Sequence, residues 1–390
     1  MNGKVALRPR WPFLIAAWAA LLAYLVLNAV RRVGGPTGDF VHFYEAARAM
    51  VRGQDIYASG RGGYIYPPLL AFLYTPVAGL SEAPAAVVLL ICNMGLMLLS
   101  VFLAARELAR RLGVAADTRT LCTVALTAML LAADKAKGEL QMWQTNVLLL
   151  FLFTAALTLL DRRPALAGAA LGLAFNIKFL PIVLFPYLLL RQRWAAAGAF
   201  AASAVGFALL PAVLTGWDAN LRYQEVAYGG LLRLMGVPIG AARAANIANI
   251  SAEFSVSVPS GIARLTGAGG FTGVALPAAG LVALAALAAA AWMYRRNGVP
   301  LLYRPDGGAE DAPAARAVVG LEWACLMMAV LVFSPQTNTR HLCLLLFPQT
   351  LAVSLLLYTR PGVRRLPLLI GTAVLAAGLV LPFGGEDTLQ

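Results

Sequence analysis

Histidine, cysteine and acidic residues are all scarce in this chain of 390 residues. It contains two histidines, four cysteines, and 18 aspartates and glutamates against 31 lysines and arginines. With two histidines, no C-x-x-C pair and no aspartate-rich motif, the sequence lacks the common metal-binding and dithiol patterns. We therefore expect no metal site and no cofactor, and we interpret the cysteines as small apolar residues of apolar segments.

Charged residues are also sparse, at 13% of the chain, whereas 60% of residues are hydrophobic. A soluble domain of this length could not bury so much apolar surface and would aggregate. The composition is typical of a multi-span membrane protein whose apolar side chains face lipid. The net charge of +13 fits basic loops that set membrane topology. Binding of nucleic acid is not expected, because no basic patch with interleaved aromatics lies outside the apolar runs.

Apolar runs recur along the chain and predict an all-α polytopic membrane protein, a single domain (1–390) with about eleven or twelve transmembrane helices. The runs that we interpret as spans are 11–30, 84–105, 119–133, 145–160, 164–176, 179–190, 194–214, 271–294, 317–333, 342–358 and 366–383. The runs 164–176 and 179–190 are short, so they are either two tilted helices or one broken helix.

Arginine-rich short loops follow alternate spans, which places these loops and the N-terminus in the cytoplasm. Two long segments, 31–83 and 215–270, then lie on the outer face. In the first, apolar residues from Phe43 to Val51 recur at helical spacing and predict an amphipathic juxtamembrane helix. A second short helix is expected from Leu69 to Val77, with a proline in its first turn.

Two features of the first outer segment could carry chemistry. Asp39 follows the glycine-rich stretch 34–38 and precedes the amphipathic helix, so it is a helix N-cap, a carboxylate held near the membrane surface, or both. Tyr64 and Tyr66 flank Ile65 just before a proline pair. Aromatic residues at this depth are either membrane-belt anchors or stacking surfaces for sugar rings.

Cations and further polar residues come from distant parts of the chain. Lys178 lies among apolar residues at a helix junction, where it needs an anionic partner unless it snorkels to the interface. Arg340 and His341 adjoin in the polar segment 334–341, and His42 is the other histidine. We interpret both histidines as polar contacts on the outer face.

The segment before the fourth span holds several polar residues. Gln144 and Asn146 stand at its start, where Thr145 or Asn146 is a natural N-cap. Asp134 and Glu139, with two nearby lysines, are expected to form a solvated loop.

Together these segments resemble glycosyltransferase family 87, the polyprenol-phosphate-mannose-dependent mannosyltransferases and related arabinosyltransferases of the GT-C fold. The resemblance rests on four segments: Gly38-Asp39-Phe40 through Tyr66-Pro67-Pro68, Trp143-Gln144-Thr145-Asn146, Lys178-x-x-Pro181, and Ser334 through Arg340-His341. The third resembles the family's helix-hairpin segment. In the second, Trp143 replaces the glycine of the family's Gly-Gln-x-Asn. In the fourth, Arg340 stands where the family often has the first of two histidines, so we expect no role that needs a histidine pair.

The resemblance implies a membrane glycosyltransferase that moves a sugar, most simply mannose, from a polyprenyl-phosphate donor to a lipid-linked or glycan acceptor with inversion. It also implies that Asp39 is the catalytic base. Displacing a carrier phosphate needs such a base and cations that hold the departing group. The expected donor-phosphate ligands are Lys178, Arg340 and His341. The expected substrate-binding residues are His42, Tyr64, Tyr66, Gln144 and Asn146.

The expected partners are the polyprenyl-phosphate sugar, the acceptor and membrane lipids. High alanine and arginine usage suggests a bacterial source, so the expected location is the inner (plasma) membrane, with the active site on the periplasmic or extracellular face. The alternative is a polytopic transporter or a flippase for lipid-linked saccharides. Ionisable residues within spans are typical of that class, and Glu322 is the one acid clearly inside a predicted span.

Overall fold

The computed structural model describes residues 9–31, 38–59, 63–234, 250–267, 275–299, 312–358 and 366–380. The regular elements among these residues are all helices. In chain order they are α1 (Trp11–Val30), α2 (Phe40–Val51), α3 (Pro68–Tyr74), η1 (Thr75–Val77), α4 (Glu82–Arg111), α5 (Thr118–Leu131), α6 (Ala133–Met142), α7 (Asn146–Leu159), α8 (Pro164–Phe175), η2 (Leu180–Val183), α9 (Leu184–Leu190), α10 (Trp194–Leu209), α11 (Ala212–Thr215), α12 (Trp217–Leu234), α13 (Val258–Leu265), α14 (Ala275–Arg296), α15 (Ala312–Phe333), η3 (Thr339–Leu345), α16 (Leu346–Tyr358) and α17 (Leu366–Val380).

Over the residues that the structure describes, the predicted spans coincide with helices, which confirms an all-α polytopic membrane protein. Within the described ranges, six helical segments are long and apolar enough to cross a membrane, or seven if the bent pair α6–α7 counts as one span. The shorter apolar helices α5, α8 and η2–α9 cannot cross a core of about 30 Å upright. Length and composition therefore support fewer full crossings than the eleven or twelve expected.

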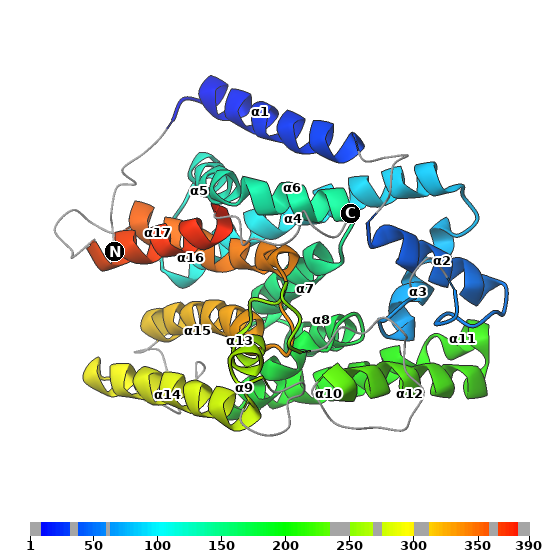
Figure 1. The fold of residues 1–390 in the computed structure, drawn as a ribbon. Helices are drawn as coiled ribbons and strands as arrows, with labels where there is room; N and C mark the ends of the chain where they lie inside the picture. Colours follow the sequence, from blue (N-terminus) through cyan, green and yellow to red (C-terminus); the bar gives the residue numbers. More distant parts are fainter. Residues whose placement is uncertain are drawn as a thin grey trace.

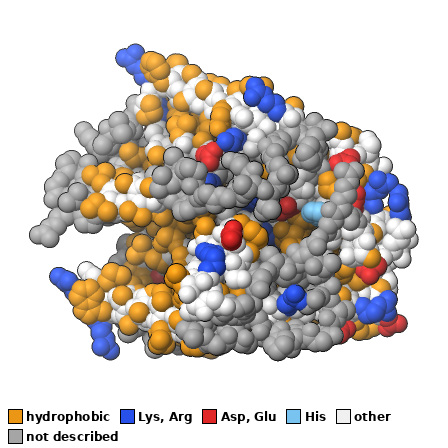
Figure 2. All heavy atoms as spheres, in the orientation of Figure 1, with side chains coloured by type: hydrophobic (Ala, Val, Ile, Leu, Met, Phe, Trp, Pro, Cys, Tyr) orange, Lys and Arg blue, Asp and Glu red, His pale blue; other side chains and the backbone are white. Residues whose placement is uncertain are grey.

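Long helices run side by side, and α2, α3 and α11 gather at one end of the bundle (Figure 1). Apolar side chains are spread over the coloured part of the visible surface, and lysine and arginine side chains lie scattered among them (Figure 2). Leu281, Leu284 and Leu287 of α14 are each more than 60% exposed. Such exposure is expected where a helix faces lipid.

The two helices predicted within residues 31–83 are present as α2 and α3. The helix α2 is packed more deeply than an interfacial helix, because eight of its residues are buried: Phe40, Val41, Phe43, Tyr44, Ala46, Ala47, Ala49 and Met50. The Tyr44 hydroxyl donates to the Leu80 carbonyl (2.6 Å), which ties α2 to the start of α4. Residues 34–37 of the glycine-rich stretch lie outside the described ranges, as do 235–249 and 268–270 of the second outer segment.

The helix α8 packs closely on α10 through two glycines. A Cβ atom on Gly168 would overlap the Ala196 carbonyl, and one on Gly172 would overlap the Ser203 side chain. Small residues four apart let helix backbones approach closely in membranes. At the end of α8 the Asn176 amide donates to the carbonyls of Gly172 (3.0 Å) and Ala204 (2.8 Å). This packing fixes the position at which the chain leaves α8, two residues before Lys178.

Glu322 of α15 is tied to neighbouring helices. Its carboxylate accepts hydrogen bonds from Tyr187 of α9 (2.8 Å), from the Arg191 guanidinium, and from Tyr294 of α14 (2.6 Å). Glu322 and Arg191 are each less than 10% exposed. The acid that would mark a transporter is therefore paired with a cation and held by two tyrosines.

Candidate active site

Asp39 lies at the start of α2 and faces a cation from the far end of the chain. Its Oδ1 accepts from Arg340 Nη1 at 3.3 Å. Asp39 occupies the N-cap position of α2, but its side chain makes no hydrogen bond to the first turn, so a side-chain cap is not observed. A Cβ on Gly38 would lie 2.7 Å from the Met142 sulfur, so glycine lets the chain pass close to α6. The Asp39 and Arg340 side chains are 29% and 28% exposed, which leaves this pair accessible.

Lys178 is buried and close enough to this pair for both charges to act on its pKa, and it belongs to a hydrogen-bonded chain that the sequence did not predict. Its ammonium donates to Asn146 Oδ1 (2.6 Å), and Asn146 Nδ2 donates to Glu139 Oε2 (3.1 Å). Glu139 Oε1 accepts from the Val147 amide (3.2 Å). Snorkelling is therefore not observed, since Lys178 is 8% exposed and points to a buried partner.

The expectation of a solvated loop around Glu139 is wrong. The segment forms α6, and Glu139 is fully buried. A bend of 118° between α6 and α7 turns this carboxylate back onto the first turn of α7. Neither Thr145 nor Asn146 caps α7 with its side chain, and Glu139 supplies that acceptor instead. In the sequence, the neighbouring apolar residues Leu140 and Met142 could have indicated that Glu139 is buried.

His341 completes the arrangement from η3, which packs against α6 and α7. Its Nδ1 accepts from the backbone amide of Asn338 (3.1 Å) as part of a capping box. A neutral imidazole whose Nδ1 accepts carries its proton on Nε2. That Nε2 lies 3.2 Å from the Lys178 ammonium nitrogen. The Lys178 ammonium and the protonated Nε2 of His341 are thus two potential hydrogen-bond donors that lie close together.

Tyr66 lies against Lys178, with the ammonium 5.4 Å from the centre of its ring. Phe43 of α2 packs edge-on against that ring at 5.0 Å, and the Tyr57 hydroxyl donates to the Tyr66 carbonyl (2.8 Å). Burial, followed by the charges of Asp39 and Glu139, raises the pKa of Tyr66 well above its ordinary value. Tyr66 is therefore a neutral phenol close to both carboxylates.

Tyr64 is placed differently from the substrate-binding role expected of it. Its side chain is fully buried. The hydroxyl donates to the Pro67 carbonyl (2.5 Å) and accepts from the Ala71 amide (3.0 Å). These two bonds hold the start of α3, so the geometry favours a supporting role.

The structure does not bring His42 or Gln144 into the hydrogen-bonded cluster. His42 is half-buried on α2, and Gln144 is buried at the α6–α7 bend. His42 Nδ1 and Gln144 Oε1 have no hydrogen-bond partner among the described residues. Trp143 adopts φ +49° and packs its ring against Phe40 at 6.1 Å. A positive φ favours glycine, which explains why a glycine suits this position.

The charged groups of the cluster are two carboxylates, Asp39 and Glu139, and two cations, Lys178 and Arg340. Burial lowers the pKa of Lys178 to about 8, while the negative charges of Glu139 and Asp39 oppose that decrease. Within the described ranges, no group of three or more His, Cys, Asp or Glu side chains could hold a metal ion. The arrangement can bind an anion beside an accessible carboxylate.

The model of glycosyltransferase family 87 matches residues 64–305, more than half of the chain. The chain belongs to glycosyltransferase family 87. The matched region contains Tyr66, Glu139, Asn146 and Lys178 of the site, whereas Asp39 and the segment with Arg340 and His341 lie outside it. The family suggested by the sequence motifs is thus confirmed.

The chain is also similar to a polyprenol-phosphate-mannose-dependent alpha-(1-2)-phosphatidylinositol pentamannoside mannosyltransferase of Mycolicibacterium smegmatis. The two are 27% identical over 279 residues. The alignment covers 71% of this chain and 58% of that relative, so this chain spans little more than half the length of the relative. No solved structure matches the chain.

Proposed function

We propose that this chain transfers a sugar from a polyprenyl-phosphate donor to a lipid-linked or glycan acceptor, with inversion at the anomeric carbon. The observation that carries the proposal is the accessible Asp39 carboxylate beside Arg340, next to a buried Lys178 and the Nε2 of His341. Family membership supports glycosyl transfer, and the similarity to a polyprenol-phosphate-mannose-dependent mycobacterial relative supports polyprenol-phosphate mannose as the first donor to test.

The donor phosphate binds between the cations. The Lys178 ammonium nitrogen and His341 Nε2 lie 3.2 Å apart, so a phosphate oxygen that binds beside them can accept from both. Arg340 then releases Asp39 and binds a second phosphate oxygen. A guanidinium suits this role because it can hold phosphate through two parallel bonds. These contacts strengthen as negative charge builds up on the departing phosphate, which is what lowers the barrier.

Asp39 is the base because Glu139, the other carboxylate of the cluster, is fully buried and already accepts from Asn146 and Val147. The acceptor hydroxyl oxygen forms a bond to the anomeric carbon while the bond from that carbon to the phosphate oxygen breaks. Asp39 takes the hydroxyl proton, and the carrier phosphate leaves with the bonding electron pair. One displacement of this kind inverts the anomeric centre.

Asn146 positions Lys178 in this scheme. Its Oδ1 accepts from Lys178 and its Nδ2 donates to Glu139, so both ends of the amide are occupied by protein. Tyr66 presents its ring next to Lys178 and is the better placed of the two tyrosines to contact the sugar.

We place the site on the outer, periplasmic face of a bacterial inner membrane. The support is the distribution of charge along the helices. The pair Arg110-Arg111 ends α4, and the pair Arg162-Arg163 follows the end of α7 that lies away from Asn146. Arginine enrichment in short loops marks the cytoplasmic side.

The test uses the purified full chain in lipid nanodiscs. It is incubated with polyprenyl-phosphate mannose, glucose or arabinose and total membrane lipid, and products are identified by mass. We expect transfer from one of these donors, and Asp39→Asn should lower its rate about 10²–10⁴-fold. Asp218→Asn, an exposed aspartate of α12, is the matched control. Absence of transfer from every donor, or near-normal transfer by Asp39→Asn, contradicts the proposal.

A further inference from the structure

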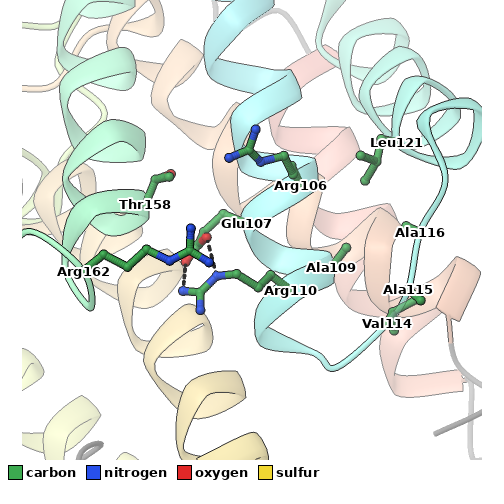
Figure 3. Close-up of a pocket in the computed structure, with 10 residues that line it drawn as sticks. All are labelled: Arg106, Glu107, Ala109, Arg110, Val114, Ala115, Ala116, Leu121, Thr158 and Arg162. Carbon is green, nitrogen blue, oxygen red and sulfur yellow. Dashed lines mark hydrogen bonds and ion pairs between the residues drawn. The ribbon is translucent and has the colours of Figure 1, made fainter.

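A second polar site lies at the other end of α7 from the candidate active site. It is a cavity of about 320 Å³ whose charged wall consists of Arg106, Glu107, Arg110 and Arg162 (Figure 3). Asn146 of the active site begins α7, and Arg162 follows its last turn. At the helical rise of 1.5 Å per residue the two sites are roughly 20 Å apart. No step of the proposed glycosyl transfer uses this cavity.

Cations outnumber carboxylates around the cavity. Glu107 pairs with Arg110 and Arg111, and Asp161 pairs with Arg110, Arg111 and Arg193. Among the described residues, Glu107 and Asp161 are thus each shared by more than one arginine.

Two further arginines, Arg106 and Arg162, are exposed and make no ion pair within the part of the chain that the structure describes. Among the residues that line the cavity, three arginines, Arg106, Arg110 and Arg162, stand against one carboxylate, Glu107. Figure 3 shows the side chains of Arg106, Arg110 and Arg162 together on one side of the cavity. Guanidinium groups in such an array suit a phosphate, which accepts paired hydrogen bonds.

The opposite wall is apolar. It is formed by Val114 and Ala116 of the α4–α5 loop and by Leu121 of α5 (Figure 3). A free inorganic anion would gain nothing from this wall, whereas the glycerol and acyl carbons next to a lipid phosphate would bury apolar surface on it. Basic pockets between helices at a membrane boundary are typical lipid headgroup sites.

We infer that this cavity binds a phosphate-bearing anion, the headgroup of an anionic membrane lipid, on the membrane face opposite the active site. The arginines bind the phosphate and the Val114–Leu121 wall receives the adjoining lipid carbons. Arginines whose only role is to set the membrane topology would not need to line a cavity. The inference is independent of the proposed glycosyl transfer.

The experiment measures binding of three probes to the purified full chain by native mass spectrometry: phosphatidylglycerol, zwitterionic phosphatidylcholine and inorganic phosphate. The wild type is expected to prefer phosphatidylglycerol. Arg106→Ala/Arg162→Ala should bind it roughly thirtyfold more weakly, since each arginine near an anionic headgroup contributes about a fivefold factor. Arg295→Ala/Arg296→Ala, at the exposed end of α14, is the matched control and should bind as the wild type does.

Tight binding of inorganic phosphate that is lost in the alanine variant would support the anion site and assign it to a free phosphate. A second variant, Arg106→Lys/Arg162→Lys, keeps the charge and should bind phosphatidylglycerol within about fivefold of the wild type. The inference is overturned if the alanine variant binds phosphatidylglycerol and inorganic phosphate as tightly as the wild type does. It is also overturned if the wild type binds neither anion.

Discussion

Two buried polar clusters in this protein differ in how completely their charges are satisfied. Around Glu322, the Arg191 guanidinium and the hydroxyls of Tyr187 and Tyr294 all donate to one carboxylate. Around Lys178, the ammonium donates to one acceptor among the described residues, Asn146, and otherwise faces the Nε2 of a histidine. The first cluster is closed by protein groups, whereas the second has donors to spare and adjoins the accessible Asp39–Arg340 pair.

This difference separates a structural role from a binding role. A buried charge is tolerated in a membrane protein when protein groups pair with it, and the Glu322 cluster meets that condition. The Lys178 cluster meets it only in part, because its charge reaches Glu139 through the amide of Asn146. The comparison also weakens the transporter alternative, since the acid inside a predicted span is occupied by a cation and two phenols.

Glu322→Ala gives the largest expected effect on the closed cluster. Removing the carboxylate leaves Arg191 buried without this ion pair, and breaking such pairs typically costs about 3–5 kcal/mol. We expect a strong loss of thermal stability in detergent or nanodiscs, with transfer per folded molecule unchanged. If stability is kept and transfer is lost, Glu322 has a role in function and the distinction between the clusters is wrong.

Lys178→Met tests the cluster around Lys178, in which some hydrogen-bond donors lack a protein acceptor among the described residues. Loss of one preorganised charge that stabilises a leaving group lowers rates about 10²–10³-fold. We expect this decrease in transfer rate at saturating donor, and a smaller change in stability than Glu322→Ala causes. The matched control is Lys137→Met on α6, because Lys137 pairs with the exposed Asp134 (2.7 Å). Near-normal transfer by Lys178→Met contradicts the phosphate assignment.

Glu139→Gln should act on Lys178 indirectly. Glutamine keeps an oxygen near Asn146 and Val147 but removes the negative charge that opposes the lowering of the Lys178 pKa from its ordinary value to about 8. The pKa of Lys178 then falls further, so its cationic form is lost at a lower pH. We expect roughly tenfold slower transfer at neutral pH and an alkaline limb of the pH–rate profile that begins at lower pH. A purely structural role would lower stability without moving that limb.

The sequence identified most of the residues in this site but not all of the contacts between them. Asp39, Lys178, Arg340 and His341 stood out because charged or polar residues near apolar runs need partners, and the structure brings Asp39 to Arg340 and Lys178 to His341. The part played by Glu139 depends on the bend at Trp143–Thr145, which no local pattern specifies.

The positions of the helices could also be predicted from local sequence, whereas their membrane crossings could not. Apolar runs predicted where they lie, because hydrophobic periodicity is a local property. Which of them cross the membrane depends on packing. The short helix α8 is covered by α10 through Gly168 and Gly172, and Lys178 follows directly from that packing.

Tyr64→Phe gives the smallest expected effect and sharpens the comparison within one loop. The Tyr64 hydroxyl bonds only to backbone groups of Pro67 and Ala71 among the described residues, so its loss should lower stability by about 1–3 kcal/mol. Transfer per folded molecule should stay normal. Tyr66→Ala, which removes the ring next to Lys178, should instead slow transfer clearly. Measured side by side, these variants decide which tyrosine contacts the substrate. If Tyr64→Phe is the slower enzyme, the substrate-binding role first expected of Tyr64 stands and the supporting role is wrong.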